Sequence, residues 1–443
     1  MAVRELAAGA DLLALAQRFP ERYPHLLESA LIGQAPARFS ILFAFPGVTR
    51  SSATGDDVLA VMDGDLSGSS ALAPDTERYG HLPFLGGWFI YAGYELAWRL
   101  EPALGECVPD PWLPDVLATY FPAALVRDHH ENVTYFVDEA DNPEYQVQLQ
   151  SDLEAVASGN GTETRALPAL ELQEEDEQQY LDAVGRGLEY IRAGDTFQVN
   201  LSREWRAKAA GDLDPAGLYA RLRTANAAPF AAWLQLPGAH VVSSSPERLV
   251  AVEAGNVETR PIAGTRHRDP DAHMDRRLVS DLQANIKERS EHVMLVDLER
   301  NDIGRVAETG SVRVAELMTI ESYRRVHHIV SSIVGRLRAG TTGADILRAA
   351  FPGGTITGCP KIRSMQIIQE LEQYRPRGAY TGGCGYISRH GRMDTNILIR
   401  TLVIRGNQLR FRAGAGIVAD SDPRRELEET RHKARGLVDA LQG

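Results

Sequence analysis

The chain has 443 residues and carries 47 Lys and Arg against 60 Asp and Glu, a formal net charge of −13 at pH 7. An acidic chain without a basic tract excludes broad binding to nucleic acids. Charged residues interrupt the N-terminal sequence and every apolar run elsewhere, so we expect a cytoplasmic protein with neither signal peptide nor membrane span. The three cysteines, Cys107, Cys359 and Cys384, are an odd number without metal-ligand spacing. They predict free thiols, not a disulfide framework or a zinc site.

The N-terminal part of the chain predicts mostly β-strands. Short apolar runs at 38–44, 87–91, 123–126 and 133–137 alternate with turn-rich segments. Residues from about 155 to 178 lose their apolar periodicity and become acidic, which is typical of a linker. We therefore divide the chain into a β-rich N-terminal region, 1–155, and a larger C-terminal region, 172–443.

Beyond the linker, helical and strand patterns are mixed. Apolar residues from Tyr180 to Ile191 follow one helical stripe, and Gly194 is placed to end that helix. Further elements are expected as helices at 275–298, 344–350 and 361–372, and as strands at 196–203, 240–245, 396–404 and 408–411, the last two joined as a hairpin. The sequence has neither a strict β-α-β alternation nor a glycine-rich dinucleotide-binding pattern. It predicts an α+β fold, a sandwich of antiparallel sheets covered by helices in one large unit.

Two pairs of glutamates have the spacing of a shared helical face. Glu426 and Glu429 follow the glycine-containing run 414–416, where the backbone can approach a ligand closely, and Glu288 and Glu291 repeat the spacing. An all-oxygen site with few protein ligands suits Mg²⁺, which an anionic substrate often completes. The hypothesis is a carboxylate box formed by two helices around one Mg²⁺. The alternative is two solvated helix faces, since such pairs are common in acidic helices.

Nine runs in the C-terminal region resemble one enzyme family. In chain order they are GDTFQVNLSR, SSSPERLV, ETRPIAGTRHR, EHVMLVDLERNDIGRV, VHHIVSSIVG, FPGGTITGCPKIRSMQII, GGCGYIS, MDTNILIRT and AGAGIVADSDPRRELEET. Together they resemble the chorismate-utilising enzymes, namely component I of anthranilate synthase and of aminodeoxychorismate synthase, and the isochorismate and salicylate synthases. The match runs from about Tyr180 to the C-terminus, and the first half resembles the N-terminal region of anthranilate synthase component I more weakly. The resemblance implies that family's fold and makes 172–443 the chorismate-binding catalytic region.

The resemblance implies a role for each candidate site residue. Chorismate is a small dianion with a leaving hydroxyl at C4, so its site needs a cation, anion-binding groups and a general acid. The implied catalytic residues are Glu247, as the acid that protonates the departing hydroxyl, His328, Thr265 and Gln198. The implied substrate contacts are Gly264, Thr265, Tyr380, Arg400, Gly414, Ala415, Gly416 and Lys361. The implied ligands of Mg²⁺ are Glu291 and Glu429 directly, and Glu288 and Glu426 through water.

Gln198 bears on the attacking nucleophile. The isochorismate and salicylate synthases that this run resembles carry a lysine here as general base for water, whereas the ammonia-using enzymes carry glutamine. An amide cannot take that proton. Gln198 therefore favours amination over hydration.

Ala263 and the surrounding runs favour different products. Many aminodeoxychorismate synthases have a lysine at this position that attacks C2, whereas anthranilate synthases have alanine. Several runs, among them NAAPFAAWL, AAFPGGTITG and MDTNILIRT, look more like the aminodeoxychorismate branch. We therefore expect an Mg²⁺-dependent transferase, a lysine-free aminodeoxychorismate synthase component I of folate biosynthesis. Anthranilate synthase component I is the alternative.

Three further expectations concern ligands and partners. The sequence has no nucleophilic cysteine in a glycine-rich elbow, so a separate glutamine amidotransferase subunit, component II, is expected to supply ammonia. Ser29, Pro229 and Phe230 match a tryptophan pocket that is regulatory in anthranilate synthases. A catalytically inactive chorismate-binding subunit is the remaining alternative. The joint presence of the candidate acid, histidine, arginine and glutamates speaks against it.

Overall fold

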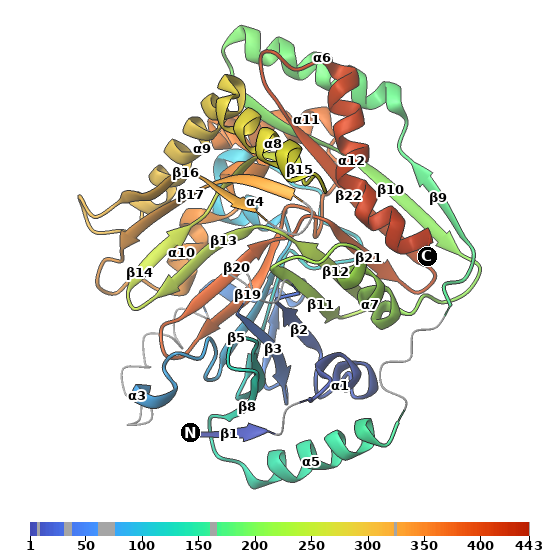
Figure 1. The fold of residues 1–443 in the computed structure, drawn as a ribbon, viewed down its shortest axis with the longest axis vertical. Coiled ribbons are helices and arrows are strands. Elements are labelled where there is room, and N and C mark those ends of the chain that lie inside the picture. The colour runs from blue at the N-terminus through green and yellow to red at the C-terminus, as the bar shows by residue number, and fades with distance from the viewer. Residues whose placement is uncertain (7–8, 31–37, 61–75, 160–165, 323–325, 443) are drawn as a thin grey trace.

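The computed structural model describes residues 1–6, 9–30, 38–60, 76–159, 166–322 and 326–442, which form two large antiparallel sheets packed face to face (Figure 1). Helices cover the outer faces, so the layers run helix, sheet, sheet, helix. The predicted α+β sandwich is confirmed. None of the described helices is long and apolar enough to cross a membrane. Cys107, Cys359 and Cys384 are free thiols, as expected.

The first sheet has twelve strands among the described residues. Across the sheet they are β1 (Ala2–Leu6), β8 (Val133–Asp138), β7 (Ala123–Asp128), β3 (Phe39–Ala44), β2 (His25–Glu28), β11 (Phe230–Leu236), β12 (Ala239–Ser245), β21 (Thr401–Arg405), β22 (Gln408–Ile417), β10 (Gln198–Ala209) and β18 (Gly358–Cys359), with β9 (Leu170–Glu174) also on β10. The N-terminal strand β2 pairs directly with β11, so this sheet joins both regions of the chain.

The second sheet has ten strands among the described residues. Across the sheet they are β15 (Ile262–His267), β17 (Val326–Arg336), β14 (Asn256–Thr259), β13 (Arg248–Glu253), β20 (Met393–Ile397), β19 (Gly383–Ser388), β5 (Gly87–Ala92), β6 (Val116–Phe121) and β4 (Thr49–Ser51), with β16 (Arg313–Ser322) also on β17. Here β5 pairs with β19, so early and late strands again share one sheet.

The helices lie over the two outer faces and at the edge of the first sheet (Figure 1). They are α1 (Leu12–Arg18), α3 (Thr76–Tyr79), α4 (Leu96–Leu100), α5 (Pro143–Ala157), α6 (Glu177–Ala193), α7 (Pro215–Ala225), α8 (Ala272–Ala284), α9 (Ile286–Gly304), α10 (Gly343–Ala350), α11 (Lys361–Leu371) and α12 (Pro423–Gln442), with short 3₁₀ turns at Ser52–Thr54, Pro102–Leu104 and Gly354–Ile356. Gly194 ends α6 in the left-handed conformation that glycine adopts without strain, as the sequence predicted.

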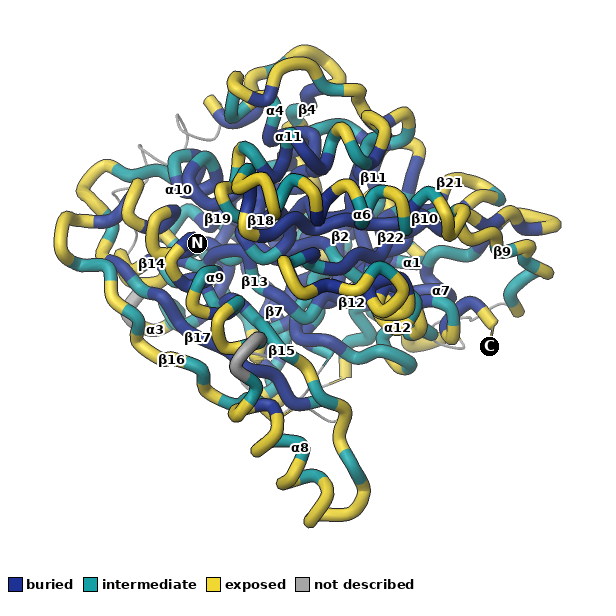
Figure 2. The backbone as a smooth tube through the Cα atoms, turned by 90° about the horizontal axis from the view of Figure 1, so that it is seen from above, coloured by how far each residue is buried: buried dark blue, intermediate teal, exposed yellow. Residues whose placement is uncertain are grey.

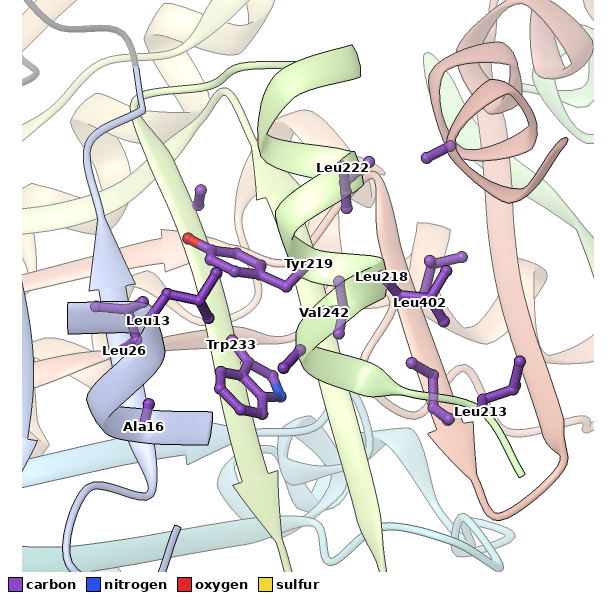
Figure 3. Close-up of a cluster of buried hydrophobic side chains, with 14 of the residues drawn as sticks. Leu13, Ala16, Leu26, Leu213, Leu218, Tyr219, Leu222, Trp233, Val242 and Leu402 are labelled. Carbon is purple, nitrogen blue, oxygen red and sulfur yellow. The ribbon is translucent and has the colours of Figure 1, made fainter. Parts of the chain in front are cut away.

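Buried side chains form one core between the sheets and others under the helices. Between the sheets, Phe43 of the first sheet meets Phe89 and Phe121 of the second. On the outer face of the first sheet, α1 and β2 pack with α7, β11 and β12 through residues that include Tyr219 and Trp233 (Figure 3). Figure 2 shows buried backbone through the central strands and exposed backbone along α8, which projects from one side. The N-terminal region is thus an integral part of the core.

Two elements that the sequence predicted as continuous are each divided in two. The helix expected at 275–298 is two helices, α8 and α9, because the Asn285 side chain accepts the Glu288 backbone N–H and begins a new helix. The strand expected at 396–404 is broken between β20 and β21, where Arg400 has φ of +52°. That conformation takes the chain out of the extended region. Within the expected linker, Leu170–Glu174 forms β9 and pairs with β10, while residues 160–165 lie outside the described residues.

A buried ionic cluster joins β10, β22 and the end of α11. Glu372 accepts hydrogen bonds from Arg377 at 2.6 Å and from Arg412 at 2.9 Å. It also accepts the backbone N–H and the hydroxyl of Ser202, at 2.9 and 2.8 Å, and Arg377 donates to the Asn200 carbonyl at 2.8 Å. Burial opposes the ionisation of Glu372, but the two guanidinium groups lower its pKa to about 2. The cluster therefore fixes β10 against β22 with charges that no water screens.

We expect Glu372→Gln to lower the free energy of unfolding by about 3–5 kcal/mol, because it leaves two buried arginines without a counter-charge. The stabilisation is present above the ordinary glutamate pKa and is lost as pH falls towards 2, since the folded-state pKa is depressed. Urea unfolding measures both effects. The matched control is Glu370→Gln, an exposed position on the same helix, which should change stability by no more than about 0.5 kcal/mol. Equal losses in the two variants would contradict a stabilising role for the cluster.

Candidate functional site

Glycines in β22 form the floor of the candidate site. Gly414 lies opposite Ser202 and Gly416 lies opposite Asn200 in the β10–β22 register. A Cβ on Gly414 would lie 2.6 Å from the Leu201 carbonyl oxygen and 2.7 Å from the Tyr380 hydroxyl. The two glycines are required because neighbouring groups occupy the space where a side chain would stand. The glycines lie within the strand itself, whereas the sequence placed them beyond it.

Gln198 lies at the start of β10 and is buried. A Cβ on Gly416 would collide with its Nε2, so the amide lies over the glycine floor. No described residue donates a hydrogen bond to its Oε1. The structure thus brings Gln198, Tyr380 and the glycine run 414–416 together.

Helix α12 adds a lysine that the sequence reading missed. Lys433 donates to the Gly414 carbonyl at 3.0 Å and pairs with Glu429 at 2.8 Å. Burial lowers the pKa of Lys433, but Glu429 more than compensates and the pKa is raised overall. The lysine therefore stays charged beside the glycine floor. Its spacing, four residues after Glu429 and on the same helical face, is the signal that could have identified it.

Glu247 is a buried carboxylic acid in the link between β12 and β13. It is 6% exposed, and no described residue donates a hydrogen bond to its Oε1. Burial raises the pKa of Glu247 to about 7, against the opposing effects of nearby Thr355, the Ile262 backbone, Lys433 and Arg400. A carboxyl group with this pKa can give up a proton at neutral pH.

Arg400 is a cation without a protein counter-ion. It lies at the break between β20 and β21, and none of the described carboxylates forms an ion pair with it. Burial lowers its pKa, and the charge of Glu247 opposes that effect. A largely buried guanidinium that is left unpaired by the protein is suited to bind an anion in a bidentate manner.

His328 and Thr265 face each other across the β15–β17 pair. The Thr265 hydroxyl and His328 Nδ1 are 2.8 Å apart. Burial lowers the pKa of His328 to about 4, and the nearby Arg400 and His327 add to this, so the imidazole is neutral at pH 7. Gly264, with φ of +62°, sits at the bulge beside them, and a Cβ there would collide with a carboxylate oxygen of Glu288.

The four candidate glutamates lie on the two predicted helices but are not gathered into one cluster. Glu288 pairs with Arg266 at 2.7 Å through one oxygen, while its other oxygen is buried without a hydrogen-bond partner. Glu429 pairs with Lys433, Glu426 is buried beside it on α12, and Glu291 is half-buried on α9. Within the described ranges, no three His, Cys, Asp or Glu side chains are close enough to hold a metal ion. The carboxylate oxygens, among them the unpartnered oxygen of Glu288, fit Mg²⁺. The ion would compete with Arg266 and Lys433 for these carboxylates.

Five buried polar atoms at the site have no hydrogen-bond partner among the described residues. Buried polar groups rarely lack one, so a ligand is expected to complete them. The atoms are Oε1 of Gln198, Oδ1 of Asn200, Oε1 of Glu247, Oε2 of Glu288 and Oγ1 of Thr355. The sequence reading missed Asn200 and Thr355. For Asn200 the signal was its place two residues after Gln198, on the same face of a strand.

Lys361 and the residues of the expected tryptophan pocket lie away from the glycines of β22. Lys361 begins α11, pairs with Asp302 at 2.5 Å and lines a cavity of about 770 Å³ whose walls include none of the site residues above. Its contact with substrate stays a prediction. The Ser29 hydroxyl donates to the Pro229 carbonyl at 3.2 Å, and Asn396 donates to the Phe230 carbonyl at 3.1 Å. Ser29 and Pro229 of the expected tryptophan pocket are therefore in contact, next to β2 and β11, and the pocket itself stays a prediction.

The whole chain is similar to proteins of known activity and structure. An anthranilate synthase component 1 from Thermus thermophilus is 40% identical, with 97% of this chain and 94% of that protein covered. An aminodeoxychorismate synthase component 1 from Klebsiella aerogenes is 38% identical, with 94% and 93% covered. The crystal structure of anthranilate synthase component I from Streptococcus pneumoniae superimposes with a TM-score of 0.80 at 33% identity, with 92% of this chain and 93% of that chain covered.

A family model described as chorismate binding enzyme matches residues 35–439, which is most of the chain and includes every residue of the glycine floor, the buried acid and the unpaired arginine. Relatives that carry two different activity names align over almost the whole length of this chain. The chain therefore belongs to the chorismate-binding enzyme family.

Proposed function

We propose that this chorismate-utilising enzyme is an aminodeoxychorismate synthase component I, which converts chorismate and ammonia to 4-amino-4-deoxychorismate. The observation that carries amination is the buried amide of Gln198 over the glycine floor. A base that deprotonates water is needed at this point for hydration, and an amide cannot serve as one. Ammonia is itself a nucleophile and needs only to be bound and oriented.

The charged groups of the site suit a dianion with a leaving hydroxyl. Arg400 and Lys433 supply positive charge, and the backbone of Gly264 and of 414–416 supplies close contacts for carboxylates. Glu247 protonates the departing oxygen, because its pKa near 7 leaves a large protonated fraction at neutral pH. His328 is neutral and is held by Thr265, so it is positioned to exchange hydrogen bonds without adding charge.

Magnesium is part of this proposal. Glu291 and Glu429 would bind the ion, and Glu288 and Glu426 would hold its waters. When bound, the ion supplies positive charge that orients a substrate carboxylate. The free oxygen of Glu288 and the purely carboxylate composition of the set support this assignment.

A glutamine amidotransferase subunit is the proposed source of ammonia. Amide hydrolysis requires an activated nucleophile. The free thiols of Cys359 and Cys384 have pKa values raised by burial, so neither is activated for attack. The same applies to Cys107. Glutamine hydrolysis is therefore assigned to a separate chain.

A second candidate function is that of anthranilate synthase component I, and Ala263 favours it. This residue lies on β15 opposite Ile329, next to Gly264. A methyl group cannot attack C2, so an aminodeoxychorismate synthase with alanine here must use a small external nucleophile at that carbon. The runs around 353–357 and 393–401 favour the aminodeoxychorismate branch instead, and the product decides between the two.

Chorismate with an ammonium salt and Mg²⁺ should give a product that aminodeoxychorismate lyase converts to p-aminobenzoate. Intact-protein mass spectrometry with chorismate alone should show no mass gain, because Ala263 offers no nucleophile. Glutamine in place of ammonium is the control and should give no product from the single chain. Anthranilate as the dominant product would favour the second candidate. No turnover at all would indicate a subunit that only binds chorismate.

Glu247→Gln should lower kcat by about 10²–10⁴-fold, because the leaving hydroxyl loses its proton donor. The wild-type kcat should fall as pH rises above about 7, since the acid acts only when protonated. The variant should lack this descending limb and should bind chorismate almost normally. A pH–rate series with a chorismate titration measures both, and a defect confined to affinity would assign Glu247 a binding role only.

Glu429→Gln should lower Mg²⁺-dependent turnover by about 100-fold or more, because the substitution removes a ligand charge from the ion. The matched control is Glu428→Gln, an exposed neighbour that pairs with Arg431 at the surface. Rates measured across a MgCl₂ titration should show a loss of Mg²⁺ response in the first variant alone. Near-normal activity of Glu429→Gln at low Mg²⁺ would rule out the carboxylate box.

A further inference from the structure

Two amide side chains, those of Gln198 and Asn200, lie on one face of β10. Successive side chains of a strand alternate between its faces, so Gln198 and Asn200 project to the same side. Gln198 lies over Gly416, and Asn200 Oδ1 lies 3.0 Å from where a Cβ on Gly414 would stand. Both amide oxygens are buried without a hydrogen-bond donor among the described residues.

The surroundings of Asn200 fix which end of its amide faces the floor. Its Nδ2 donates to the Thr355 carbonyl at 3.4 Å, and its backbone N–H donates to the Thr357 carbonyl at 2.9 Å. Its own carbonyl accepts from Arg377 at 2.8 Å. The residue is 8% exposed, so the side chain has little freedom to turn. The oxygen is therefore held towards the glycines of β22, and no described residue donates a hydrogen bond to it.

The chemistry of the two oxygens selects the kind of ligand that can satisfy them. A chorismate carboxylate offers only acceptors, so it cannot pair with an amide oxygen, and the single hydroxyl of chorismate has one O–H, which can satisfy only one of the two oxygens. Ammonia offers three N–H donors and one lone pair. Two amide oxygens can take two of those N–H groups and leave the lone pair directed away from the floor, towards a substrate bound above it.

We propose that Asn200 and Gln198 together form the binding subsite for ammonia, which rests on the proposed amination of chorismate. Nothing in the sequence patterns or in the comparisons assigns a role to Asn200. The nitrogen lone pair forms a C–N bond at C2, the ring π electrons shift, and the C4–O bond breaks. The proton of Glu247 goes to the departing oxygen, so that water leaves, and the surplus proton on nitrogen returns to the Glu247 carboxylate. For the 4-amino product a second ammonia then attacks C4, the π electrons shift back, and the nitrogen at C2 leaves as ammonia with a proton from Glu247. The surplus proton on the new nitrogen again returns to the Glu247 carboxylate, which completes the balance.

The test is the dependence of the rate on ammonium chloride in Asn200→Ala, at fixed pH and saturating chorismate. The KM for ammonia should rise about 10-fold or more, because one of its two acceptors is lost. The Kd for chorismate, measured by intrinsic fluorescence without ammonium, should stay within about twofold, since the carboxylates do not contact this amide. Asn200→Leu, with a similar side-chain volume, provides the same measurement if the smaller residue impairs folding.

The matched control is Ser202→Ala, on the same face of β10, which removes the hydroxyl bound to Glu372 but keeps the backbone N–H that Glu372 also accepts. It should leave the KM for ammonia within about twofold. An unchanged KM for ammonia in both Asn200 variants would overturn the subsite, and so would an equal rise in Ser202→Ala or an equal loss of chorismate affinity. Anthranilate as product would overturn only the product assignment, because the readout is nitrogen incorporation. A wild-type enzyme that aminates nothing would overturn both proposals.

Discussion

The register of β10 against β22 is the constraint on which the site depends. With Ser202 opposite Gly414 and Asn200 opposite Gly416, every functional side chain of β10 stands over a residue that has no side chain of its own. A slip of one residue would turn Gln198 and Asn200 to the opposite face. Glu372 opposes the slip, because it accepts the backbone N–H of Ser202 on one strand and a hydrogen bond from Arg412 on the other.

The charged and titratable groups of the site differ in exposure: Glu247 and His328 are buried, Arg400 is half-buried, and the Lys433 side chain is 45% exposed. Arg400 forms no ion pair with any described residue, whereas Lys433 pairs with Glu429. The same burial that keeps His328 neutral raises the pKa of Glu247 into the neutral range. A dianionic substrate adds negative charge near Glu247, which favours its protonated form further. In the proposed reaction, substrate binding therefore favours the protonated form of Glu247 that acts as the acid.

Part of the fold and of the candidate site could be predicted from the sequence, because periodicity reports which face of a helix or strand is buried. The sandwich of antiparallel sheets, the α6 stop at Gly194 and the glutamate pairs on helices were all predicted. The break at Asn285 was missed, since a single capping hydrogen bond outweighed an uninterrupted helical pattern. Lys433 and Asn200 had local signals, the spacing from Glu429 and from Gln198, but their contacts with Gly414 join residues that are distant in the sequence or on another strand. Glu288 also pairs with Arg266, which is distant in the sequence, so no helical spacing rule reveals that contact.

The choice of nucleophile follows from the hydrogen-bonding character of one strand face. Attack by water requires removal of a proton, so a hydrating site needs a base. Attack by ammonia requires no base, and its three N–H groups need acceptors instead. A pair of amide oxygens can accept the N–H groups of ammonia but cannot remove a proton from water. The face of β10 that carries Gln198 and Asn200 thus disfavours hydration through its chemistry, without any need to exclude water from the space.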